Sequence, residues 1–193
     1  KFPGCASAGS IATPPDTVST HLRELSIQGK RHGGVHAAAG KLGAGAGDKV
    51  RLALLGIIFK SKDLPEQYNQ AQLVLWLKRE ALFEPIEAEL KGAGRSLAQE
   101  LLHMYVPNHL ARALLAVRPG MANSESEARQ LRKAQFPQVQ DVSNDQMESA
   151  ITEALSNGDN FPLTLVVLDE VQQYIGNDVD KAYLVQEVTE TLC

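Results

Sequence analysis

Cysteine, aromatic residues and long apolar runs are all scarce in this sequence of 193 residues. Its two cysteines, Cys5 and Cys193, lie near opposite ends and form no CxxC pair, so neither a disulfide framework nor a cysteine zinc site is indicated. We expect both thiols to be free, as in a reducing compartment. No apolar run approaches the ~20 residues of a membrane helix, and the first residues lack the apolar core of a signal peptide. The sequence therefore predicts a cytoplasmic protein with no membrane partner.

An excess of positive charge is also missing. The chain has 19 Lys and Arg against 23 Asp and Glu, a net charge of -4. Such a balance provides no basic field for nucleic acid, so DNA is expected as a partner only through a larger protein. The remaining composition, 44% hydrophobic and 22% charged, is typical of a globular domain with a core.

Helix boundaries are marked along the chain by proline, glycine and capping residues. Three capping boxes, each a serine followed three residues later by Gln or Glu, begin at Ser96, Ser124 and Ser143. Expected helices cover residues 16–29, 50–60, 65–77 and 143–158, and further helices begin at Pro85, Ser96, Pro107 and Ser124. We expect the charged residues of the helix from Ser124 to face solvent.

Two short segments have the composition of strands. Residues 35–40 are a possible buried strand, and residues 163–168 form a run rich in Leu and Val without alternation. The second pattern is typical of a parallel strand covered by helices on both faces. The predicted fold class is therefore α/β, predominantly helical with a small, largely parallel sheet.

The order of these segments predicts three regions. Residues 1–49 form an irregular lead-in, a helix and a glycine-rich loop; residues 50–158 form a helical array like an insertion; residues 159–193 form a strand and a helix. Because the chain opens with Lys1 rather than Met, we expect one compact unit excised from a larger protein, whose other domains would be its partners.

The stretch from Leu42 to Lys49 has the glycine content of a phosphate-binding loop. A P-loop has the pattern G-x-x-x-x-G-K-[S/T], in which backbone amides and lysine hold phosphates and the hydroxyl holds Mg²⁺. Here Asp48 separates Gly47 from Lys49, and Val50 replaces the hydroxyl residue. A carboxylate would repel phosphate, so a glycine-rich loop before a helix is the favoured interpretation.

Two adjacent carboxylates follow the apolar segment 163–168. Ligands of α/β sheets bind at the carboxyl ends of the strands, and an apolar strand followed by Asp-Glu has the Walker B pattern of P-loop ATPases. In that pattern Asp169 would hold Mg²⁺ and Glu170 would be the catalytic base that activates water. Neighbouring strand residues point to opposite sides, so one carboxylate could face the metal and the other the nucleophile.

The sequence LTLVVLDEVQQYIG, together with RLALLGIIFKSKDLPEQYNQAQLVLWLK, ELLHMYVPNHLARALL and AQFPQVQDVSND, resembles the large ATPases of BREX-type phage-resistance systems, the BrxC/PglY group. This resemblance implies an AAA+-like P-loop NTPase core, ATP and Mg²⁺ as cofactors of the parent protein, and other defence-system proteins as possible partners. The family's Walker A motif should precede the matched region and is not found here. Only Asp169 and Glu170 are therefore carried over, and the segment alone is expected to lack ATPase activity.

A second function class stays open beside the ATPase hypothesis. The chain could be a helical protein-interaction module in which residues 163–168 are core and Asp-Glu has no catalytic role. Histidine chemistry is weakly indicated, because two glycines separate His32 from His36, while His103 and His109 flank a proline without other ligands nearby. No tightly bound cofactor is expected in this segment by itself.

Overall fold

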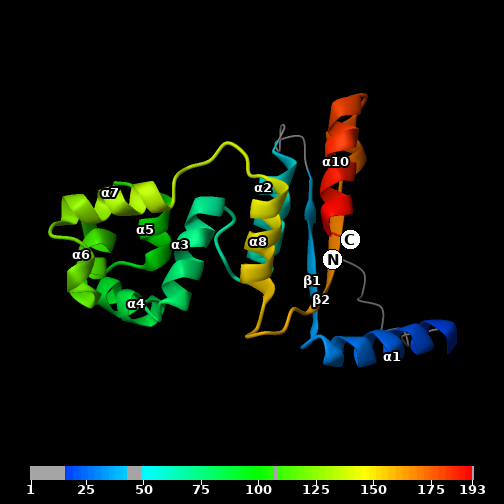
Figure 1. Cartoon of the computed structure of the whole chain (residues 1–193), viewed down its shortest axis with the longest axis horizontal. Coiled ribbons are helices and arrows are strands. Elements are labelled where there is room, and N and C mark those ends of the chain that lie inside the picture. The colour runs from blue at the N-terminus through cyan, green and yellow to red at the C-terminus, as the bar shows by residue number, and fades with distance from the viewer. Residues whose placement is uncertain (1–15, 43–48, 107, 193) are drawn as a thin grey trace, which may run out of the picture.

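Helices make up most of the described chain, and some of them pack on one face of a small parallel sheet (Figure 1). The computed structural model describes residues 16–42, 49–106 and 108–192. Cys5, Cys193 and the glycine-rich stretch 43–48 lie outside these described residues, so the predictions made for them are not addressed. The coarse prediction of a mostly helical α/β chain with a small parallel sheet is confirmed within the described part.

The sheet pairs two strands that are far apart in the sequence. Strand β1 covers Val35–Lys41 and strand β2 covers Leu163–Asp169. They run parallel, in a register that places Val35 beside Leu163 and Lys41 beside Asp169. Both predicted strands are therefore present, and their carboxyl ends lie side by side at the same end of the sheet.

One face of this sheet, the covered face, is packed against helices. It carries His36, Ala38 and Gly40 on β1, with Thr164, Val166 and Leu168 on β2. Helix α2 (Val50–Lys60) lies directly on it, with α8 (Asn144–Leu155) and α10 (Val179–Leu192) beside α2. The approach is close, since a Cβ added to Gly40 would lie 2.6 Å from Cγ1 of Ile57.

The opposite face, the open face, has no helix on it among the described residues. Its apolar residues are Val35, Ala37, Ala39, Leu163, Leu165 and Val167, and the same alternation places Lys41 and Asp169 at its carboxyl end. Leu165 is 60% exposed and Val167 is 48% exposed. The prediction that β2 is covered on both faces is therefore wrong for the described part of the chain. An apolar run without alternation indicates that the residues on both faces of a strand would be stabilised by burial. It does not determine whether a second layer of helices covers the other face.

A second group of helices forms the side of the molecule away from the sheet (Figure 1). These are α3 (Tyr68–Arg79), α4 (Phe83–Gly92), α5 (Leu97–Leu102), α6 (Asn108–Val117), the 3₁₀ turn η2 (Pro119–Met121) and α7 (Glu125–Gln135). Buried residues of α3, α4, α5 and α6 belong to the same hydrophobic core as those of α2 and α8. The predicted helical array is thus a packed layer and not an independent solenoid.

Local capping signals gave the helix boundaries with few errors. Ser96 and Ser143 form complete capping boxes with Gln99 and Gln146. At Ser124 the box is incomplete, because the Glu127 side chain accepts from the backbone N–H of Asn123 instead. Serine caps act within one turn, which explains why their effect can be predicted from spacing alone.

Several helix boundaries and one surface prediction differ from the structure. Helix α4 begins at Phe83 rather than at Pro85, and α8 ends at Leu155 rather than at Gly158. The first helix, α1 (Asp16–Arg31), continues through Gly29, and α3 begins at Tyr68 rather than at Pro65. Arg132 of α7 does not face solvent, since it is 1% exposed and its guanidinium has no hydrogen-bond partner. Burial, together with the positive charge of the neighbouring Arg129, lowers the pKa of Arg132 to about 10.

Candidate functional site

Asp169 is the last residue of β2 and lies where the two parallel strands end. Its backbone C=O accepts the N–H of Leu42 at 2.8 Å, which extends the pairing one residue beyond β1. Its side-chain Oδ1 accepts the N–H of Glu170 at 2.8 Å. The other carboxylate oxygen has no partner among the described residues, and the residue is exposed. Asp169 can therefore offer an oxygen ligand at this edge of the sheet.

Glu170 does not continue the strand. Its backbone is left-handed, with φ 60 and ψ 18, and it is the residue before the short helix α9 (Val171–Ile175). A non-glycine residue rarely adopts this conformation, which costs on the order of 1 kcal/mol. The argument that strand alternation separates the two carboxylates is therefore wrong, because the turn at Glu170 decides where its side chain goes.

Lys41 is the residue that sequence reasoning missed. Its Nζ donates to Oε1 of Glu170 at 2.6 Å, and the register places Lys41 directly beside Asp169. The hydrogen bond and the charge of Glu170 raise the pKa of Lys41, and the charge of Asp169 adds to that effect. The only signal in the sequence was a lysine at the end of a short strand. Such a lysine does not indicate a functional site until the strand that pairs with it is known.

The three charged residues thus form one group at the carboxyl ends of both strands. Lys41 brings one positive charge to two carboxylates, so the group keeps a net negative charge while Glu170 stays oriented. A single free carboxylate oxygen and a held glutamate suit Mg²⁺, which is commonly bound through one or two carboxylates and substrate phosphates. Among the described residues there is no cluster of three or more His, Cys, Asp or Glu side chains that could hold a metal alone.

The chain leaves this edge of the sheet through the glycine-rich stretch. Leu42 extends the β1 pairing, and Lys49 precedes the first residue of α2. Residues 43–48, on which the P-loop alternative rests, lie outside the described residues. The sequence order is therefore strand, glycine-rich stretch and helix, with the strand paired directly to the one that ends in Asp-Glu.

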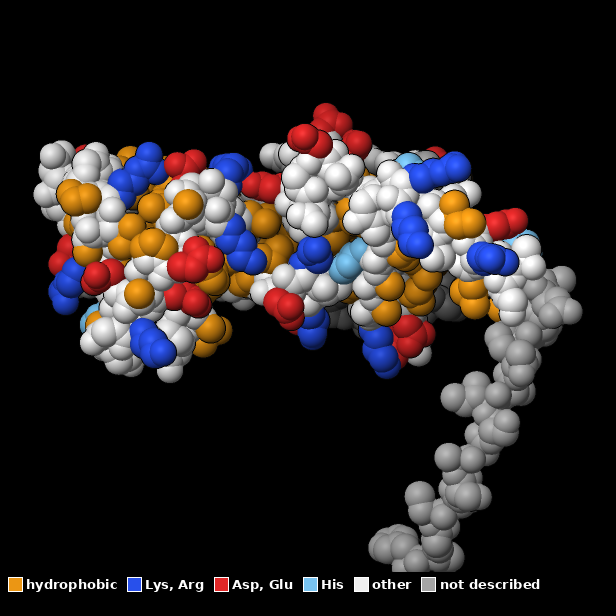
Figure 2. Space-filling model, turned by 90° about the horizontal axis from the view of Figure 1, so that it is seen from below, with side chains coloured by type: hydrophobic (Ala, Val, Ile, Leu, Met, Phe, Trp, Pro, Cys, Tyr) orange, Lys and Arg blue, Asp and Glu red, His pale blue; other side chains and the backbone are white. Residues whose placement is uncertain are grey.

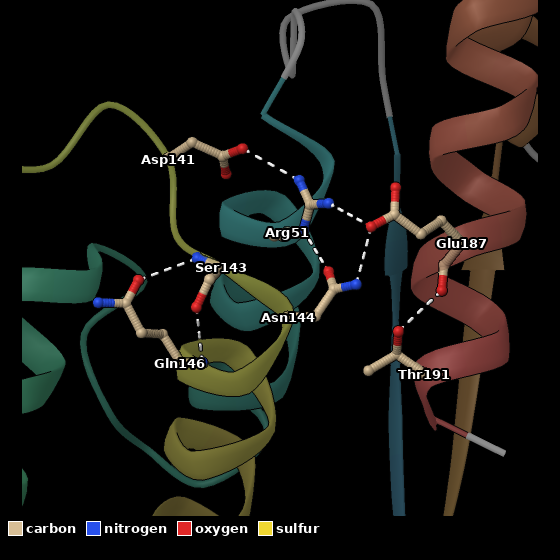
Figure 3. Close-up of polar contacts among 7 residues, drawn as sticks. All are labelled: Arg51, Asp141, Ser143, Asn144, Gln146, Glu187 and Thr191. Carbon is tan, nitrogen blue, oxygen red and sulfur yellow. Dashed lines mark hydrogen bonds and ion pairs between the residues drawn. The ribbon is translucent and has the colours of Figure 1, made fainter.

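A polar cluster fixes the amino end of α2 (Figure 3). Arg51 donates from Nε to Oδ1 of Asn144 at 2.6 Å, from Nη1 to Oδ2 of Asp141 at 3.1 Å, and from Nη2 to Oε1 of Glu187 at 2.9 Å. Asn144 donates to the same oxygen of Glu187 at 2.8 Å, and this bond is the main cause that lowers the pKa of Glu187. Since Arg51 follows the glycine-rich stretch, the cluster joins that end of α2 to α8 and α10.

The residues after Glu170 are divided between surface and core. Gln172 and Gln173 are exposed, whereas Tyr174 is buried, with Nζ of Lys181 5.1 Å from the centre of its ring. Tyr174 therefore anchors α9 against the core and does not extend the charged group. The backbone N–H of Gln173 donates to the C=O of Glu170 at 3.0 Å, as expected at the start of α9, and neither glutamine side chain makes a hydrogen bond to Asp169 or Glu170 in the described part.

The histidine candidates are not brought together. His36 lies on the covered face with Nε2 2.8 Å from Oγ of Ser61, and that hydroxyl donates to the C=O of Ile58. His32 is exposed in the link before β1. Burial lowers the pKa of His36, and the positive charge of Lys62 lowers it further. Because the Ser61 proton is already donated to a carbonyl, the His36 and Ser61 pair lacks the arrangement of an activated nucleophile.

Comparison with known proteins adds no family. No protein-family model, curated protein or solved structure matches the chain. In the described part, every helix is too short or too polar to cross a lipid bilayer.

Proposed function

We propose that this chain is a segment of an ATP-hydrolysing P-loop protein, in which Asp169 and Glu170 are the Walker B pair. The observation that carries the proposal is the position of Asp169 and Glu170 at the carboxyl end of a parallel strand, beside the end of a second one. Ligands of parallel α/β sheets bind at this edge. The strained backbone at Glu170 adds support, because such conformations are kept where a side chain must be aimed.

Each charged residue has a separate task in this proposal. Asp169 holds Mg²⁺, and that ion neutralises charge on the nucleotide phosphates when it is bound. Glu170 accepts a proton from the attacking water. Lys41 is a positioning residue, since its hydrogen bond at 2.6 Å holds the Glu170 carboxylate in the present structure. The lysine must release or shift this bond for Glu170 to act as a base.

The biological setting follows from the resemblance of the sequence and is part of the proposal. The parent would be a cytoplasmic ATPase of a BREX-like phage-defence system, with its own further domains and other defence proteins as partners. DNA would be reached only through that parent. The segment alone would not hydrolyse ATP, because its sequence does not contain the Walker A pattern G-x-x-x-x-G-K-[S/T].

The test uses the longer protein that the proposal requires. Glu170→Gln should leave nucleotide binding intact while lowering turnover ~10²- to 10⁴-fold, since the amide cannot accept a proton. Asp169→Ala should weaken Mg²⁺-dependent binding as well as turnover. The matched controls are Glu148→Gln and Asp159→Ala, two exposed sites away from the charged group, which should behave as wild type. Full activity in the Glu170→Gln protein, or robust ATPase activity of the isolated 193-residue chain, would contradict the proposal.

A helical protein-interaction module remains the second candidate function, and one feature favours it. A mainly apolar cavity of about 410 Å³ opens between α3, α4 and α5, with Val74, Phe83 and Leu101 in its lining. The same substitutions separate the two functions. If Glu170→Gln and Asp169→Ala both keep wild-type behaviour while Val74→Asp abolishes a partner interaction, the module is the correct interpretation.

A further inference from the structure

The open face is an apolar surface large enough to take a helix. Its six apolar residues come from both strands, and its two charged residues, Lys41 and Asp169, lie at its carboxyl end. On β1 the face carries the small side chains of Ala37 and Ala39, whereas on β2 it carries the larger side chains of Leu165 and Val167. A helix packs well on such a surface, because small residues let its backbone approach and larger ones fill its grooves.

Helix α1 carries a second apolar surface that is also uncovered. Val18, Leu22 and Leu25 follow one another at intervals of four and three residues, and all three are more than 40% exposed. In the structure α1 lies crosswise at the amino end of the strands and points away from the body (Figure 1). Figure 2 shows hydrophobic side chains at the surface of this helix between Lys and Arg side chains. An amphipathic helix of this kind normally has its apolar stripe buried.

Helix α1 and strand β1 are similar in length and adjoin each other. Sixteen residues of α1 span about 24 Å at 1.5 Å per residue, and the seven residues of β1 span about 23 Å. Gly29 of α1 already approaches the Val35 side chain, so closely that a Cβ there would collide with it. The link between them contains Gly33 at φ 78 and Gly34 at φ 135, conformations that favour glycine and permit a sharp change of direction.

We propose that two copies of this chain form a dimer by reciprocal exchange of α1, in which the α1 of each copy packs on the open face of the other. The projecting position of α1 argues for a second copy as the occupant, because its own open face lies beyond the sharp turn at Gly33 and Gly34. Exchange of an element across a short hinge is a common route to a symmetric dimer, and the contact is the same in both directions.

The size of the contact is sufficient for a specific dimer. A helix about 24 Å long and about 10 Å wide covers about 240 Å² of a flat face. Two such contacts, each with a helix side and a sheet side, bury about 1,000 Å² in all, where biological interfaces begin. This inference does not rest on the proposed ATPase function, although the α1 of a second copy would reach Lys41 and Asp169 at the carboxyl end of the open face.

The experiment measures the mass of the full chain by sedimentation equilibrium over a range of concentrations. We expect a dimer, and we expect Leu22→Glu on α1 or Val167→Lys on the open face to raise its dissociation constant at least ~10²-fold, since each places a charge in an apolar contact. Leu102→Glu, at an exposed site on α5, is the matched control and should leave the dimer intact. Far-UV circular dichroism and thermal unfolding show whether each variant is folded.

Mixing the two weakened variants tests reciprocity directly. In a heterodimer of a Leu22→Glu chain and a Val167→Lys chain, one of the two α1 contacts contains both substitutions and the other contains neither. The unchanged contact should allow the mixture to form a heterodimer even when neither variant dimerises alone. A monomeric wild-type chain would overturn the proposal, whether hydrogen exchange finds the α1 amides open or protected by packing on its own sheet. A dimer that survives both substitutions, or a mixture that stays monomeric, would overturn it as well.

Discussion

The two faces of the β1–β2 sheet both carry Ala, Val and Leu but have different surroundings. Ala38 on the covered face is 1% exposed, whereas its neighbour Ala39 on the open face is exposed. This difference in exposure arises because helices α2, α8 and α10 all lie on the same side of the sheet. The comparison teaches that strand residues alone do not determine burial; the layer placed on each face does.

The largest expected effect comes from enlarging one residue on each face. Ala38→Leu should lower the free energy of unfolding by about 1–3 kcal/mol, because the covered face has no room for a larger side chain. Ala39→Leu should change it by less than about 0.5 kcal/mol in the monomer, as for surface positions in general. Urea unfolding at low protein concentration, which keeps any dimer dissociated, measures both.

Equal losses in the two variants would break the comparison, since they would mean that both faces are packed. A gain in dimer stability for Ala39→Leu at higher concentration would instead sharpen it. The larger side chain would then add apolar area to the open face where we place the α1 of a second copy.

A smaller effect is expected from the caps that hold the covering helices in place. Ser143→Ala removes the hydroxyl that accepts the N–H of Gln146 at 3.2 Å and should cost about 1 kcal/mol of stability. Ser156→Ala at the other end of α8 is the control, because the Ser156 hydroxyl makes no hydrogen bond in the described part. Thermal unfolding of the two variants gives the difference. An equal loss at Ser156 would show that the capping box contributes nothing specific.

The smallest effect is a pH dependence that belongs to the covered face. Burial and Lys62 lower the pKa of His36 below its usual 6.5. Protonation therefore favours the unfolded chain, so the contribution of His36 is fully present above pH 6.5 and declines as the pH falls through the lowered value. The imidazole shifts in NMR spectra, followed from pH 8 to pH 4.5, give its titration midpoint.

Lys62→Met is the matched variant for this titration. Removing the positive charge should move the midpoint of His36 upward, toward 6.5, while burial keeps it below that value. A midpoint above 6.5 in the wild-type protein would contradict the covered position of the imidazole. It would also mean that the covered face does not contribute the expected pH dependence to the free energy of unfolding.

Interactions within a few residues could be predicted from the sequence. The capping boxes at Ser96 and Ser143, the helix Val50–Lys60 and the strand ending at Asp169 are all where spacing and composition place them. These features depend on hydrogen bonds and apolar periodicity inside one element. Their physical cause is local, so the amino-acid sequence is sufficient to predict them.

The candidate site could be predicted only in part. Asp169 and Glu170 were found because they are adjacent and follow an apolar run. Lys41 is 129 positions from Glu170, and its role depends on the parallel register of two strands. The left-handed turn at Glu170 was also out of reach, because sequence alternation assumed that the strand continued.

By itself, the sequence determined which segments become helices and strands and that two carboxylates would stand at the end of a strand. The tertiary structure decided which face of the sheet is covered, which lysine meets Glu170, and that Arg51 joins α2 to α8 and α10. The physical reason is that local conformation depends on neighbours along the chain. Burial and ion pairing depend on which distant segments arrive at the same place, and many arrangements share one local pattern.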